Sequence, residues 1–99
     1  MIKHIVMFKL KDFDCESDKI AAMNRIKSGL ESLQEKISVL RKIQVEFNVN
    51  PDEEYDLVLV AEFNNLNDLE IYTKHPEHVK VSAFIAENRV KRACVDYEF

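Results

Sequence analysis

The chain has 99 residues, enough for one domain over residues 1–99, and a chain this short buries only about 60 to 70% of its unfolded surface. Hydrophobic residues make up 46% and charged residues 32%, a balance that excludes intrinsic disorder. The net charge of −4, with no basic run, argues against partners such as nucleic acid or an anionic membrane.

The amino terminus lacks the features of a targeting segment. Lys3, His4 and Lys9 interrupt its apolar residues, so it does not read as a signal peptide, and no stretch has the length of a transmembrane helix. Cys15 and Cys94 lie in different predicted elements without Cys-x-x-Cys spacing, as expected for two reduced thiols. We therefore expect a cytoplasmic protein.

The first third of the chain predicts a strand followed by a helix. Residues 2–11 alternate in polarity, with Ile2, His4, Val6, Phe8 and Leu10 on one face. From Ser17 to Ile37 apolar residues recur every three or four positions, which predicts one long amphipathic helix.

Two more strands are predicted in the middle of the chain. Residues 41–49 alternate in polarity before Asn50-Pro51-Asp52, which favours a turn. Residues 56–63 are apolar on both faces, with Val58 and Val60 opposite Leu57 and Leu59, which is typical of a strand buried on both sides.

The last third predicts two helices and a closing strand. Residues 66–74 carry Leu66, Leu69 and Tyr72 along one stripe, and Pro76 ends this helix because its ring pushes the preceding residue out of helical geometry. Pro76 also begins the next helix, which is predicted to run to about Asn88. Residues 92–99 alternate again and form the last predicted strand.

The order βαββαβ predicts an α+β fold of the ferredoxin-like type, with a four-stranded antiparallel sheet in the order 4-1-3-2. Helices cover only one face of such a sheet, while Met7, Val58 and Val60 make the other face apolar. We expect a homodimer that stacks these two faces.

Three segments carry a family resemblance, at residues 2–10, at Tyr55-Asp-Leu-Val-Leu, and at Tyr72-x-x-His75-Pro-x-His78. With them the chain resembles, over essentially its whole length, the stress-responsive dimeric α/β-barrel family, often called Dabb. The resemblance implies a homodimer whose two sheets form a shared barrel with the helices outside. Many members are small bacterial proteins of undetermined activity.

The resemblance also implies candidate catalytic residues. A plant polyketide cyclase of this family performs aldol chemistry without a metal or organic cofactor. Its catalytic tyrosine and histidine match Tyr72 and His78, and a further pocket histidine matches His4. Its pocket lining differs from what this chain supplies, so its substrate is not carried over.

The residues themselves support a proton-transfer role for this cluster. His78 is about the third residue of the helix that begins at Pro76, where the helix dipole disfavours imidazolium and keeps a usable base. Tyr72 points inward, so its hydroxyl needs a partner such as a substrate carbonyl. The competing interpretation is structural, in which Tyr72, His75 and His78 only cap and pack the broken helix.

A candidate pocket is expected between the sheet and the two carboxy-terminal helices, with His4 on the opposing wall. In a 4-1-3-2 sheet the last strand lies beside the first, which brings Asp96 within reach of His4. The alternative for His4 is a hydrogen-bonded core histidine. The residues expected to line the pocket are Val6, Phe8, Leu69, Phe84 and Asp96.

Other chemistry is weaker in this sequence. His75, Glu77 and His78 lack a third metal ligand in a usable register, so no metal is predicted. The single glycine, Gly29, excludes a glycine-rich phosphate loop, so no cofactor is predicted either. Cys94 is expected to be an inert buried thiol.

Three functions remain open. The first is a homodimer that binds an apolar or aromatic carbonyl compound. The second is a cofactor-free enzyme with cyclase-like aldol or monooxygenase-like chemistry, and the third is a stress-response dimer with a purely structural role. A cavity beside Tyr72 and His78 would favour the first two, whereas Phe8 and Phe84 filling that space would favour the third.

Overall fold

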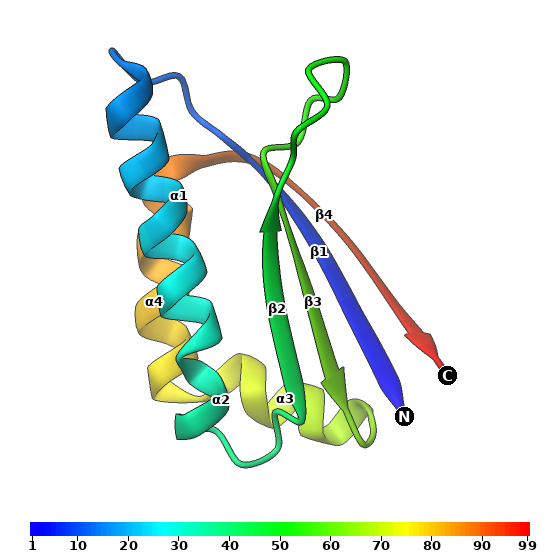
Figure 1. The fold of residues 1–99 in the computed structure, drawn as a ribbon. Coiled ribbons are helices and arrows are strands. Elements are labelled where there is room, and N and C mark those ends of the chain that lie inside the picture. The colour runs from blue at the N-terminus through cyan, green and yellow to red at the C-terminus, as the bar shows by residue number, and fades with distance from the viewer.

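The computed structural model describes all 99 residues as an antiparallel sheet with helices on one face (Figure 1). The strands are β1 (Ile2–Leu10), β2 (Lys42–Phe47), β3 (Leu57–Phe63) and β4 (Arg89–Glu98). The helices are α1 (Glu16–Glu31), α2 (Leu33–Lys36), α3 (Leu66–Lys74) and α4 (Pro76–Asn88). The sheet order β2-β3-β1-β4 confirms the predicted ferredoxin-like arrangement. None of the helices is long and apolar enough to cross a membrane.

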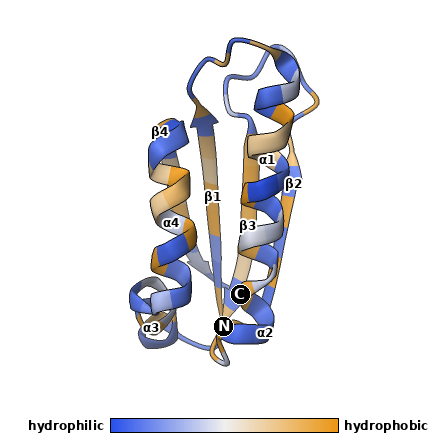
Figure 2. Ribbon diagram, turned by 90° about the vertical axis from the view of Figure 1, so that its left-hand side faces the viewer, coloured by the Kyte–Doolittle hydropathy of each residue, from blue (hydrophilic) through white to orange (hydrophobic).

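The hydrophobic core lies between the sheet and the helices. The inward side chains of β1 are all buried, as the alternation of residues 2–11 predicts. The core contains 19 residues, and its fully buried members include Ile26, Leu33, Val45 and Phe63, from α1, α2, β2 and β3. Figure 2, viewed from the helix side, shows β1 running between α4 and α1.

The opposite face of the sheet has no helix over it. Met7 on β1 is 37% exposed, and Val95 and Tyr97 on β4 are 62% and 42% exposed. Val58 and Val60 on β3 are only partly buried. The uncovered sheet face, defined by these five residues, is therefore an apolar surface, as expected from the sequence.

The first helix is shorter than predicted. Helix α1 ends at Glu31, and the predicted single helix over residues 17–37 is wrong at its carboxyl end, where the short α2 follows Ser32. The hydroxyls of Ser28 and Ser32 donate to the carbonyls of Asn24 and Gly29 at 2.6 and 2.8 Å, a type of back-bonding that bends and weakens helices. These serines account for the interruption.

The second strand is also shorter than predicted, because a side chain closes the loop that follows it. Strand β2 ends at Phe47 instead of residue 49. The side-chain amide of Asn48 donates to the carbonyls of Asn50 and Tyr55 at 3.0 and 2.8 Å. This local bonding replaces the strand ladder.

The last strand begins earlier than predicted. Helix α4 runs directly into β4, which starts at Arg89 instead of residue 92. Lys9 pairs with Lys91 but Leu10 pairs with Arg89, so Val90 is an extra residue and forms a β-bulge. The bulge shifts the alternation of inward and outward side chains by one residue. The alternating sequence pattern therefore predicts the strand only from residue 92 onward.

Candidate functional site

A cavity of about 170 Å³ lies on the helix-covered side of the sheet, between β1, β3, α1 and α4. Its apolar lining consists of Val6, Phe8, Leu30, Leu59 and Ile85. Its polar lining consists of His4, Thr73, His78, Ser82, Arg89 and Arg92. The cavity therefore combines apolar walls with several polar groups, the usual composition of a small-molecule site.

His78 occupies the third position of α4, as the sequence predicts. Its Nδ1 lies 3.0 Å from the carbonyl oxygen of Thr73. Since a carbonyl only accepts, Nδ1 carries the proton and Nε2 of the neutral ring is free to accept one. Burial lowers the pKa of His78 below its ordinary value, and the charges of His4, Arg92 and His75 lower it further against the opposing Thr73 bond. The ring is therefore a neutral base near pH 7.

Tyr72 lies beside His78, deep in the core. It is 1% exposed, and its ring centroid is 4.4 Å from that of His78 and 5.0 Å from that of Phe63. Its hydroxyl is buried without any hydrogen-bond partner. Burial raises the pKa of Tyr72 well above its ordinary value, so the hydroxyl remains a proton donor. A buried hydroxyl left without a partner is uncommon and costly.

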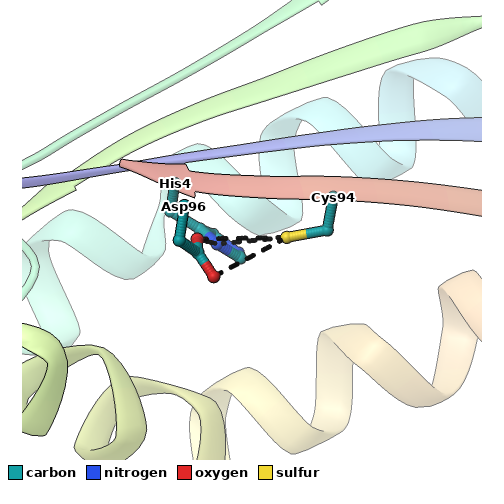
Figure 3. A group of neighbouring side chains, drawn as sticks. All are labelled: His4, Cys94 and Asp96. Carbon is teal, nitrogen blue, oxygen red and sulfur yellow. Dashed lines mark hydrogen bonds and ion pairs between the residues drawn. The ribbon is translucent and has the colours of Figure 1, made fainter. Parts of the chain in front are cut away.

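His4 faces the same side of the sheet from β1. The register places it directly opposite Asp96 on β4, and its Nδ1 lies 2.5 Å from Asp96 Oδ1 (Figure 3). Because the carboxylate accepts, Nδ1 is the donor and Nε2 is left free. This contact agrees with the expectation that Asp96 lies within reach of His4 and fixes its tautomer. Both histidines keep Nδ1 engaged and Nε2 available.

Cys94 is the third member of this group on β4. Its Sγ lies 3.6 Å from His4 Nδ1 and 3.9 Å from the Asp96 carboxylate (Figure 3). The expectation of a buried thiol is wrong, because β4 is an edge strand and Cys94 is exposed. Partial burial and the charge of Asp96 raise the pKa of Cys94, so it is not an activated nucleophile.

The same three side chains offer a nitrogen, a sulfur and an oxygen within 4.8 Å of one another. This donor set is one that Zn²⁺ accepts, and it differs from the group His75, Glu77 and His78 that the sequence offers for a metal. His75 is committed elsewhere, because its Nδ1 accepts from the backbone N–H of Glu77 at 3.1 Å and caps α4.

The structure gathers some of the predicted pocket residues and separates others. His4, Val6, Phe8 and His78 line the cavity, whereas Tyr72 does not line it and packs against the ring of His78. Three predicted lining residues lie outside it: Leu69, Phe84 and Asp96. Leu69 is a core residue of α3, and Asp96 lies behind His4.

Phe84 points away from the cavity because α4 has two rows of packed side chains, one facing α1 and the other facing the cavity. Its ring lies 3.8 Å from the guanidinium of Arg25 on α1, on the side where Val81 approaches Gly29. The stripe that faces the cavity instead contains His78, Ser82 and Ile85. Phe84 therefore does not fill the candidate site.

A larger hollow of about 490 Å³ lies elsewhere, around Leu10 and the start of α1. It is lined mainly by charged side chains, two of which form an ion pair, with Lys19 Nζ 2.9 Å from Asp56 Oδ1. That carboxylate also accepts from the backbone N–H of Leu10 at 2.7 Å. This hollow contains no histidine, the side chain best suited to act as a base near neutral pH.

The chain is thus a ferredoxin-like α+β protein with a small cavity that has apolar walls and several polar residues. Residues 2–99 match the family model described as the stress responsive A/B barrel domain, Dabb. The chain therefore belongs to the Dabb family, as the sequence resemblance indicates.

Individual relatives agree with this assignment. A stress-response A/B barrel domain-containing protein of Arabidopsis thaliana, DABB1, is 28% identical over 81 residues, which cover 82% of this chain but only 39% of that protein. A crystal structure from Bacteroides fragilis, described as a dimeric protein of unknown function with a ferredoxin-like fold, is 49% identical. It covers 99% of this chain and 95% of its own, with a TM-score of 0.93.

A second solved structure shows the same fold at lower identity. It is a dimeric ferredoxin-like protein of unknown function from Thermobifida fusca, 22% identical, with 99% and 90% of the two chains covered and a TM-score of 0.83.

Proposed function

We propose that this protein is a homodimer that binds a small apolar or aromatic carbonyl compound in the cavity between β1 and α4. The observation that carries the proposal is a cavity lined by His4 and His78. The ring of Tyr72, whose buried hydroxyl has no partner, packs against the ring of His78. A carbonyl oxygen that accepts from Tyr72 would satisfy this hydroxyl.

The size of the cavity supports a compound of about one ring. A volume of about 170 Å³ is close to that of an engineered apolar cavity of about 150 Å³ in another protein, which takes up benzene. The ring would contact Val6, Phe8 and Leu59, and the carbonyl would lie toward Tyr72 and His78. Because Phe84 lies on the other side of α4, a purely structural role is less well supported.

Acetophenone, an aromatic ketone of one ring, is a suitable probe. We expect it to shift the amide resonances of β1 and α4 in an NMR titration. Ser82→Leu should abolish binding, because it fills the cavity from an exposed helical position, and Ala83→Leu on the same helix should not. Equal binding by the two variants, or none by the native chain, would contradict the proposal. Mass spectrometry of the purified protein would also identify any retained carbonyl compound.

A second function, general-base catalysis, is favoured by the free Nε2 of His78 and its lowered pKa. Such a base would remove a proton from the carbon next to the carbonyl, which is the first step of aldol chemistry. The protein should then accelerate deuterium exchange into the methyl group of acetophenone. His78→Ala should reduce this rate by roughly 10²- to 10⁴-fold. Exchange at the buffer rate in the native protein would leave only the binding function.

The homodimer rests on the uncovered sheet face and on the related structures that are described as dimeric. Burying this face removes apolar surface from water, at roughly 25 cal/mol for each Å². Light scattering at micromolar concentration should report twice the chain mass of 11.6 kDa. Val58→Asp should weaken or abolish the dimer, while Val79→Asp on the exposed surface of α4 should not. A monomer of the native chain would contradict this assembly.

We also place the protein in the cytoplasm, because Cys15 and Cys94 are both free thiols. Rapid alkylation of intact cells should modify both residues. A disulfide or mixed disulfide at either position would argue for an oxidising compartment.

A further inference from the structure

Two arginines meet at one end of the cavity because of the β-bulge in β4. Arg92 lies opposite Phe8, so its side chain faces the helices. Arg89 is three residues earlier and would face the other side in a regular strand, but the extra residue Val90 turns it to the side of Leu10 and Phe8. Both arginines line the cavity. Bulges that redirect a side chain in this way are frequent beside binding sites.

Neither arginine has an acidic partner. Six lysines lie within ion-pair distance of carboxylates: Lys19, Lys27, Lys36, Lys74, Lys80 and Lys91. Lys91 stands between the two arginines and binds Glu54 at 2.6 Å. Arg89 and Arg92 form no salt bridge in a chain of net charge −4.

A structural role accounts for only one of the two. Arg89 is the carboxyl-terminal cap of α4, where a positive charge is favourable. Arg92 is beyond that helix and close enough to His78 and Cys94 for its charge to affect both of their pKa values. Arg92 makes no salt bridge and lines the cavity near His78, where its charge can meet that of a ligand.

We propose that the ligand is an oxo acid, in which a carboxylate binds Arg92 and Arg89 while the carbonyl lies toward His78 and Tyr72. This inference rests on the proposed carbonyl-binding function and adds the charge of the ligand. The two polar ends are separated along α4, from His78 near its start to Arg89 at its end. The apolar side chains Val6, Phe8 and Ile85 line the cavity as well and suit the carbon skeleton.

A carboxylate fits this end better than a phosphate. Guanidinium groups bind carboxylates and phosphates alike with two parallel hydrogen bonds, so the choice rests on the surroundings of the arginines. The carboxyl end of α4 lies at Arg89, and its partial negative charge disfavours a dianion more than a monoanion. Many phosphate sites also use a helix amino terminus or a glycine-rich loop, but this end of the cavity lies at the carboxyl end of α4 and the only glycine, Gly29, lies within α1.

The test compares 3-benzoylpropionate with its primary amide, which has the same shape without the charge. Calorimetric titration of the native protein should show at least about tenfold tighter binding of the acid, the range expected for hydrogen bonds to charged groups. Arg92→Gln should remove this preference and leave amide binding within about twofold. Arg41→Gln is the matched control, because Arg41 is exposed and lies outside the cavity. Thermal unfolding of both variants verifies that they fold.

The outcomes separate this inference from the proposed function. Equal binding of acid and amide, or an acid preference that survives in the Arg92→Gln, Arg89→Gln double variant, would overturn the oxo-acid assignment while carbonyl binding stands. Tighter binding of phenyl phosphate than of the acid would overturn the choice of carboxylate. If neither acid, amide nor acetophenone binds, the proposed function fails and this inference fails with it. Loss of the acid preference at high salt would support it.

Discussion

The two edges of the sheet are covered by helices to different extents. At the β2 edge the inward side chains Ile43 and Val45 are 8% and 0% exposed beneath α1. At the β4 edge the inward side chains Arg92, Cys94 and Asp96 are all exposed, because β4 extends beyond the helix layer (Figure 1). The covered edge consists of close-packed apolar residues, whereas the open edge holds Arg89 and Arg92, two of the polar residues that line the cavity.

This difference separates stability from function within one sheet. Apolar side chains at the covered edge contribute by leaving water, and their loss creates cavities. Polar side chains at the open edge contribute little to packing and remain accessible to a ligand. Tyr72 is a buried core residue, and His78, which packs against it, lines the cavity.

The largest expected effect comes from truncating the covered region. Ile26→Ala removes a side chain that is 0% exposed and should lower the free energy of unfolding by about 2–5 kcal/mol. Arg92→Gln at the open edge should change it by no more than about 0.5 kcal/mol. Urea denaturation followed by circular dichroism measures both. Comparable losses in the two variants would remove the distinction between the edges.

A smaller effect of opposite sign is expected at Tyr72. Tyr72→Phe removes a buried hydroxyl without a partner and should raise the free energy of unfolding by about 1–3 kcal/mol. The same change should weaken acetophenone binding by roughly 2- to 10-fold, because one hydrogen bond to the carbonyl is lost. Urea denaturation and NMR titration measure the two quantities.

The partly buried Tyr55, which lies outside the cavity, provides the control for this experiment. Tyr55→Phe should leave acetophenone binding unchanged. Destabilisation by Tyr72→Phe would mean that the hydroxyl has a partner in the folded protein, and the argument for a ligand carbonyl would lose its basis.

Much of this site could be predicted from the sequence because strand parity and proline placement are local signals. Alternation in residues 2–11 and 92–99 predicts that His4 faces Asp96, and Pro76 positions His78 near the start of α4. Sheet order then brings these elements together.

The rest depends on features that a repeating pattern does not reveal. The bulge at Val90 reverses strand parity, so the sequence could not indicate that Arg89 and Arg92 share a face. The sequence does not show that Phe84 lies outside the cavity, because α4 presents one row of side chains to α1 and another to the cavity, and both rows are partly apolar. Thr73 and Ser82 line the cavity without any distinctive spacing.

The smallest expected effect is a pH dependence that originates at His78. Its folded pKa lies below the ordinary value of 6.5, so between these two values the unfolded chain binds a proton that the folded chain does not. Stability should therefore be fully present above about pH 6.5 and decline as pH falls through the folded pKa. Urea denaturation at fixed protein concentration between pH 7.5 and about pH 5 would measure this decline.

Two variants assign this pH dependence to one residue. His78→Gln should flatten the decline, because glutamine does not titrate. His75→Asn should retain it, since asparagine is also a good amino-terminal cap for α4. The window lies above the range in which Glu54, Glu70 and Glu77 titrate, because their salt bridges lower the pKa of each below 4.5. A decline of equal size in His78→Gln would show that burial does not keep this imidazole neutral, and the general-base function would lose its support.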